Sequence, residues 1–229
     1  MNNGNPFKKL NRFEQGLWLS SLVVIFISSL FSGTEGVVSG IASLIGVTAL
    51  IFVAKGMITG QVLCIIFALM YGIISLFFRY YGEAITYIGM SLPMAAFSLV
   101  SWLKNPYEDS DVVKVAHLTP KKLFAVAITT VAVTALFYFV LGWLNTSNLP
   151  VSTLSIATSW AAAILTFLRS PYYALAYAAN DLVLIALWGN EALTDISCLP
   201  MVFCFIMFLA NDLYGFYNWK RMQKAQNDR

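Results

Sequence analysis

Eight long apolar runs follow one another along this chain, and they restrict its fold more than any other feature. They lie near residues 15–31, 37–54, 61–79, 84–102, 123–144, 151–168, 171–188 and 195–217. About 20 apolar residues in an α-helix cross a hydrocarbon core of about 30 Å, whereas an open sheet cannot cross it because its edges stay unpaired. Only 11% of the residues are charged, against roughly 25% in soluble proteins. The sequence therefore predicts an all-α integral membrane protein with eight transmembrane helices in one domain.

The positions of the Lys and Arg residues predict which loops face the cytoplasm, because cytoplasmic loops retain these residues. With a cytoplasmic N-terminus, every Lys and Arg except Arg79 falls on the cytoplasmic side. Both termini are then expected in the cytoplasm. The first run follows Lys8, Lys9 and Arg12 and has no small-residue cleavage site after it, so we expect a retained helix and not a signal peptide. The basic residues are spread among loops, which does not favour a nucleic-acid partner.

Two segments of the chain repeat with an offset of 107 residues. Tyr81-Gly82 precedes Leu92-Pro93-Met94, and at the same interval Trp188-Gly189 precedes Leu199-Pro200-Met201. We favour a duplication over chance agreement of short apolar words. The spans then form a 1+3+1+3 arrangement: a leading helix, a three-helix unit, a connecting helix and a second three-helix unit (15–31, 37–102, 123–144 and 151–217). The single connecting helix makes the two units parallel, a layout in which small-solute transporters bind at the interface between the repeats.

Two Asn-Asp dipeptides lie inside the last two runs, at Asn180-Asp181 and Asn211-Asp212. Asp181 is ten residues into its run, which corresponds to a depth of about 15 Å. Ionisable residues at such depth usually face the bundle interior or a water-filled cavity. Helical spacing aligns Tyr177, Asp181 and Trp188 on one face, and aligns Asn211 with Tyr214 on another. We expect Asp212 to point elsewhere, as a structural or gate-side contact.

This set of residues suits a flat heteroaromatic ring that carries a hydroxylated sugar. Aromatic side chains stack on such a ring, amides bind its polar edges, and a carboxylate favours a cationic ring. The predicted lining is Tyr177, Asn180, Asp181, Trp188, Asn211 and Tyr214, with a weaker signal for Tyr71, Ser75 and Gln61. The alternative is that the Asn and Asp side chains only join neighbouring helices, an interaction worth about 0.6–2 kcal/mol per contact in membranes.

The remaining polar and aromatic residues are assigned no binding role. The single histidine, His117, lies in a polar loop without a partner motif, and the three cysteines lie in apolar runs without metal-site or disulfide spacing. No metal, cofactor or catalytic group is therefore expected. Trp102, Trp219 and Tyr217 lie where an interfacial aromatic belt would place them. Pro93 and Pro200 are interpreted either as kinks or hinges, or as tolerated membrane prolines.

The residues quoted above resemble a known family. Gly40 to Trp102, with its Tyr81-Gly82-Glu83 and Leu92-Pro93-Met94 words, is similar to the bacterial nicotinamide riboside transporter family, PnuC. Two C-terminal segments, at 177–188 and 211–219, look like the two C-terminal signatures of that family. The family commonly has Trp-x-x-x-Asn in the seventh span, where this chain has Tyr177-x-x-x-Asp181 with Asn180 one position earlier.

The resemblance implies a SWEET-like fold with an extra leading helix, a homotrimer, and a location in the bacterial inner membrane. It implies facilitated diffusion of nicotinamide riboside, trapped by phosphorylation in the cytoplasm. Related members are thought to carry thiamine or riboflavin, so another vitamin is the first alternative, and proton coupling through Asp181 is a second. An integral-membrane enzyme is a distant alternative, because its chemistry needs paired carboxylates, a His cluster or a metal set near a membrane face. A purely structural membrane subunit is the last.

Overall fold

The computed structural model describes residues 5–30, 33–77, 79, 81–108, 110–146 and 148–228, and for residues 33–39 and 197 the backbone alone. The described chain is helical. Its elements are η1 (Pro6–Lys9), α1 (Arg12–Ser29), α2 (Gly33–Ala54), α3 (Ile58–Phe77), α4 (Tyr81–Ala84), η2 (Ile85–Ser91), α5 (Leu92–Leu103), α6 (Pro120–Trp143), α7 (Leu149–Phe167), α8 (Tyr172–Ala192), η3 (Ile196–Cys198) and α9 (Leu199–Asn227). The segment α4–η2–α5 forms one continuous span, Tyr81–Leu103. The expected end of the first run, at residue 31, lies outside the described residues.

The prediction of an all-helical membrane protein is confirmed. Five described segments are long and apolar enough to cross a membrane: α3, the Tyr81–Leu103 span, α6, α7 and α9. Large apolar side chains such as Phe13, Phe139 and Trp143 point away from the bundle, which is the arrangement expected of a surface in contact with lipid. α8 is less apolar because it carries Asn180 and Asp181, and both of these side chains are buried within the bundle.

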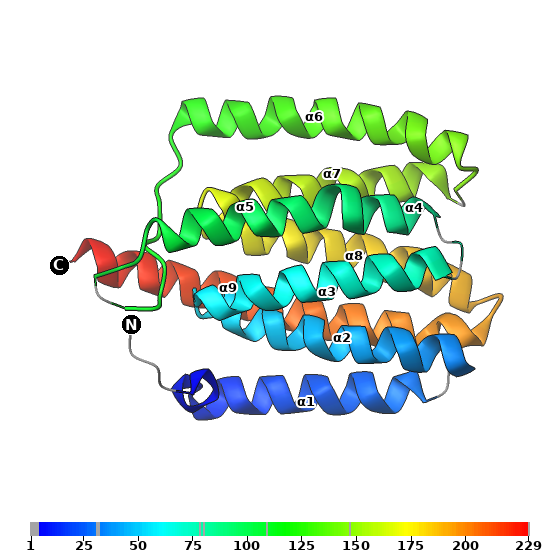
Figure 1. Ribbon diagram of the computed structural model, residues 1–229, viewed down its shortest axis with the longest axis horizontal. Helices are drawn as coiled ribbons and strands as arrows, with labels where there is room; N and C mark the ends of the chain where they lie inside the picture. The colour runs from blue at the N-terminus through cyan, green and yellow to red at the C-terminus, as the bar shows by residue number, and fades with distance from the viewer. Residues whose placement is uncertain are drawn as a thin grey trace.

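The long helices run side by side, and the two termini lie at the same end of the bundle (Figure 1). α2 packs against α3 and α3 against α5, while α7 packs against α8 and α8 against α9. The first helix of each set contacts the last helix of the other, since α2 packs against α9 and α5 against α7. α1 packs on α2 and α9, and α6 packs on α7. These contacts group the long helices into two three-helix units, α2–α3–α5 and α7–α8–α9, with one further helix beside each.

Two buried tryptophans join the units at the end of the bundle where the termini lie. The rings of Trp102 and Trp219 are both 0% exposed, and their centroids are 5.4 Å apart. Trp102 Nε1 donates to the carbonyl of Thr166 at the end of α7, and Trp219 Nε1 donates to the carbonyl of Val53 at the end of α2. The interpretation of these two residues as an interfacial belt was therefore wrong. Tyr217, in contrast, is exposed on the outside of α9.

The residue before each tryptophan bonds the next carbonyl of the same helix end. Ser101 Oγ donates to the carbonyl of Phe167, and Asn218 Nδ2 donates to the carbonyl of Ala54. The last turn of a helix leaves carbonyl groups without intrahelical partners. Each unit therefore caps the first helix of the other unit with two consecutive side chains. Exchanging the two units would convert one set of caps into the other.

The turns after α2 and α7 also match. Gly56 N–H donates to the Val53 carbonyl and Arg169 N–H to the Thr166 carbonyl, and both residues have positive φ, +69° and +57°. A helix commonly ends on such a left-handed residue. The extended 111–118 segment runs beneath both turns, with Val113 N–H donating to the Gly56 carbonyl and Ala116 N–H to the Arg169 carbonyl. Gln226 near the end of α9 holds the segment in place by bonding Val113 and Val115.

The two repeated prolines differ in their surroundings. Pro200 lies in the first turn of α9, where its missing N–H leaves no hydrogen bond unmade. Pro93 lies within the Tyr81–Leu103 span and directly follows the π-helical segment η2. Mid-helix π segments and prolines are the usual causes of kinks. The expectation of equivalent hinges therefore fits Pro93 alone.

The indole caps lead to a direct stability test. We expect Trp102→Phe to lower the free energy of unfolding by about 0.5–1.5 kcal/mol, because the buried Thr166 carbonyl loses its indole donor while the Arg169 N–H still bonds it. Trp143→Phe is the control, since Trp143 is 81% exposed and should tolerate the change. The measurement is denaturant unfolding in detergent. Equal losses in the two variants would show that the cap contributes nothing specific.

Candidate functional site

A cavity of about 850 Å³ lies between the two units. Its wall comes mainly from α2, α3, α4, η2 and α5 of the first unit and from α7, α8 and α9 of the second, and α1 and α6 contribute a few residues. It reaches the end of the bundle opposite the termini, where Arg79, Thr146 and Asp195 line it. At its other end it stops at Val53, Thr166 and Tyr173, whose neighbours are the tryptophan pair. The volume is within the usual range of roughly 300–1,000 Å³ for small-molecule sites.

Two carboxyl groups meet at the wall of this cavity. Asp181 on α8 and Asp212 on α9 both line it, both are buried, and their side chains are hydrogen bonded to each other. The structure thus reverses the expectation that Asp212 points elsewhere. The contact brings together the acidic residues of both Asn-Asp dipeptides.

Asn180 is oriented by two hydroxyl groups of α7. Ser155 Oγ donates to its carbonyl oxygen at 3.1 Å, and Thr158 Oγ1 donates to the same oxygen at 2.9 Å. Because these donors occupy the oxygen, the side-chain nitrogen lies on the other side of the carboxamide group. Asn180 also lines the cavity. Its side chain is therefore set to offer N–H donors to a ligand oxygen.

Aromatic rings line both sides of the cavity. Tyr71 and Tyr87 lie 4.5 Å apart between centroids, and Phe67 lies within 5.8 Å of each. On α8, Tyr173 and Tyr177 form an edge contact at 6.2 Å. All five rings line the cavity. Aromatic faces attract cations, and they also stack on flat rings.

The charges of the cavity wall are mostly negative. Among the described residues that line it, five are acidic and one is a basic side chain, Arg79. The acidic ones are Glu83, Asp181, Glu191, Asp195 and Asp212. Clefts lined by one sign of charge raise the local concentration of the opposite ion. The cavity is therefore suited to a cationic solute.

The predicted site residues divide into two groups. Tyr177, Asn180, Asp181, Trp188, Tyr71, Gln61 and Ser75 all line the cavity. Asn211 and Tyr214 are absent from its described lining and face α1 instead. The expectation that these two residues form a cavity stripe was wrong, because α9 is packed against α8, α2 and α1. More than one of its faces is buried, so helical phase alone did not show which polar face borders the cavity.

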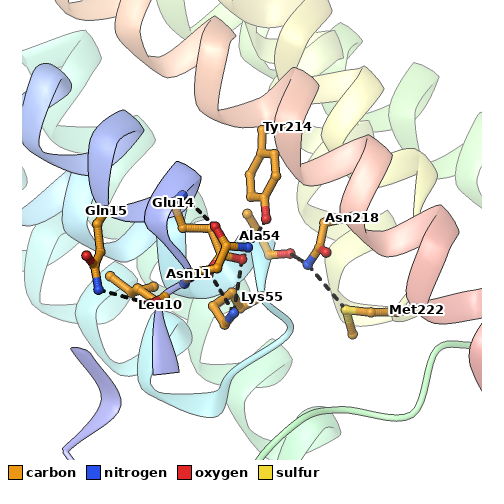
Figure 2. A network of polar contacts seen from close by, with 9 residues as sticks. All are labelled: Leu10, Asn11, Glu14, Gln15, Ala54, Lys55, Tyr214, Asn218 and Met222. Carbon is orange, nitrogen blue, oxygen red and sulfur yellow. Dashed lines mark hydrogen bonds and ion pairs between the residues drawn. The ribbon is translucent and has the colours of Figure 1, made fainter. Parts of the chain in front are cut away.

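Asn211 and Tyr214 join α9 to α1. Asn211 Nδ2 donates to Ser21 Oγ at 3.0 Å. Figure 2 shows the second contact, in which Tyr214 donates its hydroxyl to Glu14 Oε1 at 2.6 Å while Lys55 Nζ donates to both Glu14 oxygens. Glu14 also accepts from the backbone N–H of Asn11. The fully buried Glu14 carboxylate is thus paired with a cation and hydrogen bonded on both oxygens, as buried charges require.

Comparison with known proteins agrees with this geometry. Residues 36–221 match the model of a family described as nicotinamide mononucleotide transporters. This match covers well over half of the chain. The chain belongs to this transporter family.

Two relatives and one solved structure support the assignment. The nicotinamide riboside transporter PnuC of Neisseria mucosa is 22% identical over 218 residues, covering 93% of this chain and 83% of that protein. The nicotinamide riboside transporter PnuC of Haemophilus influenzae is 24% identical over 214 residues, covering 92% and 91%. A crystal structure of the vitamin B3 transporter PnuC superimposes with a TM-score of 0.79 at 22% identity, covering 95% of this chain and 94% of that one. The last comparison shows that the fold is shared.

Several residues that line the cavity of this transporter or orient its lining were missed by the sequence reasoning. Tyr87, Glu83 and Ser155 line the cavity, and Thr158 on α7 orients Asn180. A signal existed for the α7 pair, since Ser155 and Thr158 are three residues apart and share a helix face. Tyr87 gave no such signal, because the π-helical segment shifts the helical phase around it.

The bracing role of Tyr214 can be tested by removing one oxygen atom. We expect Tyr214→Phe to lower the free energy of unfolding by about 1.5–3 kcal/mol, because Glu14 loses an O–H donor to a charged group. Tyr217→Phe on the same helix is the matched control, because Tyr217 is 62% exposed. We expect it to change stability by no more than about 0.5 kcal/mol. Denaturant unfolding in detergent measures both, and similar values would contradict the assigned bond.

Proposed function

We propose that this transporter takes up nicotinamide riboside. The observation that carries the proposal is an aromatic cavity whose wall holds five carboxyl groups and one basic side chain. Nicotinamide riboside is a cationic aromatic ring bearing a hydroxylated sugar. The tyrosine rings suit its pyridinium ring, Asn180 suits its carboxamide or sugar oxygens, and Asp181 suits its positive charge. The proposed binding residues are therefore Tyr71, Gln61, Tyr177, Asn180, Asp181 and Trp188.

The same charges disfavour a phosphorylated substrate. Nicotinamide mononucleotide adds a phosphate group to the riboside, and a phosphate is normally bound by Arg, Lys or helix N-termini. The only basic side chain in the described lining is Arg79, at the mouth of the cavity. A phosphate deeper in the cavity would meet Asp181 and Asp212 instead. The riboside therefore fits this chain better than the nucleotide named in the family description.

Transport is proposed to be facilitated diffusion of the unmodified vitamin, made one-way by phosphorylation in the cytoplasm. We place the protein in the bacterial inner membrane with both termini in the cytoplasm. The termini share one end of the bundle, and the distribution of Lys and Arg supports this orientation. The cavity then opens to the outside, and the tryptophan pair closes it on the cytoplasmic side.

A homotrimer completes the proposal. Its support is the resemblance to the PnuC family, together with α6, which packs on α7 and exposes Val131, Leu136 and Phe139. Mass measurement in lipid nanodiscs tests it.

Another cationic vitamin is the second candidate. Thiamine carries a cationic thiazolium ring, and the carboxyl groups of the cavity would attract it in the same way. Asp181 stands where the family commonly has Asn, which favours a positively charged solute further. Riboflavin is neutral and gains nothing from these charges. The cavity therefore favours either cationic vitamin over riboflavin.

Uptake by proteoliposomes decides among these substrates. We expect saturable uptake of labelled nicotinamide riboside that stops at equal concentrations on the two sides. Nicotinamide mononucleotide should compete at least about tenfold more weakly, a difference of about 1.4 kcal/mol. Strong competition by thiamine alone, without uptake of the riboside, would move the assignment to thiamine. The pH is the same on both sides in this assay, so that no proton gradient contributes to the driving force.

The role of Asn180 has a matched control on the same helix. We expect Asn180→Ala to weaken binding of nicotinamide riboside about tenfold, because a hydrogen bond of about 1.4 kcal/mol is lost. Asn190→Ala should leave binding unchanged, since Asn190 is exposed near the end of α8 and is absent from the cavity lining. Tryptophan fluorescence quenching measures both variants. An equal effect of the two substitutions would remove Asn180 from the site.

A further inference from the structure

The carboxyl pair in the cavity wall has properties that binding of a solute alone does not explain. Asp181 and Asp212 come from different helices, are 3% and 4% exposed, and are hydrogen bonded to each other. Asp181 Oδ2 is buried, and no donor reaches it from the described part of the chain. Two carboxylates cannot hydrogen bond each other unless one of them holds a proton, and buried pairs of this kind share one.

In the part of the chain that the structure describes, no positive charge compensates the pair. The titratable side chains that lie within electrostatic range of it are Cys64 of α3, Tyr87 of η2, Tyr173 and Tyr177 of α8, and Cys204 of α9. None of these side chains becomes cationic. The basic side chain of the described lining, Arg79, lies at the mouth of the cavity. Lys55, which directly follows α2, is already paired with Glu14.

The arrangement also argues against a metal ion at this place. In the ranges that the structure describes, no group of three His, Cys, Asp or Glu side chains is placed to hold one. The surrounding wall consists instead of tyrosine rings and a cavity large enough for an organic solute. The cation that fits is a flat organic ring.

We propose that Asp181 and Asp212 share one proton in the substrate-free transporter, and that a cationic heteroaromatic substrate displaces this proton when it binds. The inference deepens the proposed function and rests on it for the identity of the cation. On binding, the O–H bond of the shared carboxyl group breaks and its proton passes to water in the cavity. Both carboxylates then face the positive ring. The carboxyl pair with its shared proton has a net charge of minus one, and the two carboxylates with the bound cation have the same net charge.

Calorimetry of purified transporter in detergent tests the displacement. Nicotinamide riboside is titrated near pH 7 in two buffers with different ionisation enthalpies, which gives the number of protons released. We expect about one proton for each riboside bound, and weaker binding as the pH falls, because protons compete with the cation. The neutral dihydro form of the riboside should release none. Binding of the cationic form without proton release would overturn the proposal.

Substitution of one carboxyl group isolates the pair. In Asp212→Asn the amide can donate to the Asp181 carboxylate without a shared proton, so we expect riboside binding with no proton release. Asp228→Asn makes the same chemical change at an exposed position outside the cavity and should release as many protons as the unaltered protein. Undiminished release in Asp212→Asn would also overturn the proposal.

An infrared measurement without ligand tests the shared proton independently of the identity of the substrate. We expect the spectrum of the substrate-free transporter to contain the carbonyl-stretch band of a protonated, buried carboxyl group, and Asp212→Asn to lose this band. One outcome is that the substrate-free transporter shows the band and Asp212→Asn loses it, while the riboside fails to bind. In that case the proposed substrate is wrong and the shared proton stands. Thiamine chloride then replaces the riboside in the calorimetry, and failure of both cations to release a proton overturns the displacement. Absence of the band overturns the shared proton whatever the substrate.

Discussion

The terminal carbonyl groups of α2 and α7 govern the architecture. Both helices end at the side of the bundle where the two units meet, and their last carbonyls accept hydrogen bonds from Ser101-Trp102 and Asn218-Trp219. Buried backbone carbonyls must find donors. Because each unit supplies the donors for the other, the units are held together at this end, and a cavity remains between them at the opposite end.

The polar residues of the bundle serve two separate purposes. Asn211, Tyr214 and Glu14 hold α9 to α1 through buried and partly buried contacts on the side away from the cavity. Asn180, Asp181 and Asp212 face the cavity between the units. α9 carries one residue of each kind at neighbouring positions, since Asn211 and Asp212 point in different directions. A single helix thus connects the outer brace to the solute-facing wall.

The sequence predicted the fold more completely than the site. Apolar runs of sufficient length admit only helices in lipid, so the all-helical membrane architecture followed directly. The face of α8 was also predictable, because the spacing of Tyr177, Asp181 and Trp188 gave one consistent direction. α9 was different: three helices surround it, and its polar residues are buried on more than one side. Trp102 and Trp219 were misplaced because a tryptophan near a helix end suits a lipid interface as well as a buried cap.

The matching turns after α2 and α7 bear on how such a chain evolves. At the left-handed position one copy has Gly56 and the other Arg169, and the capping residues are Ser101 in one copy and Asn218 in the other. The groups that accept these bonds are backbone carbonyls, which every amino acid possesses, so the sequence around them can vary without loss of the bonds. The same hydrogen-bonding geometry is therefore compatible with different sequences in the two units. It offers one reason why transporters that share about a fifth of their residues retain one architecture.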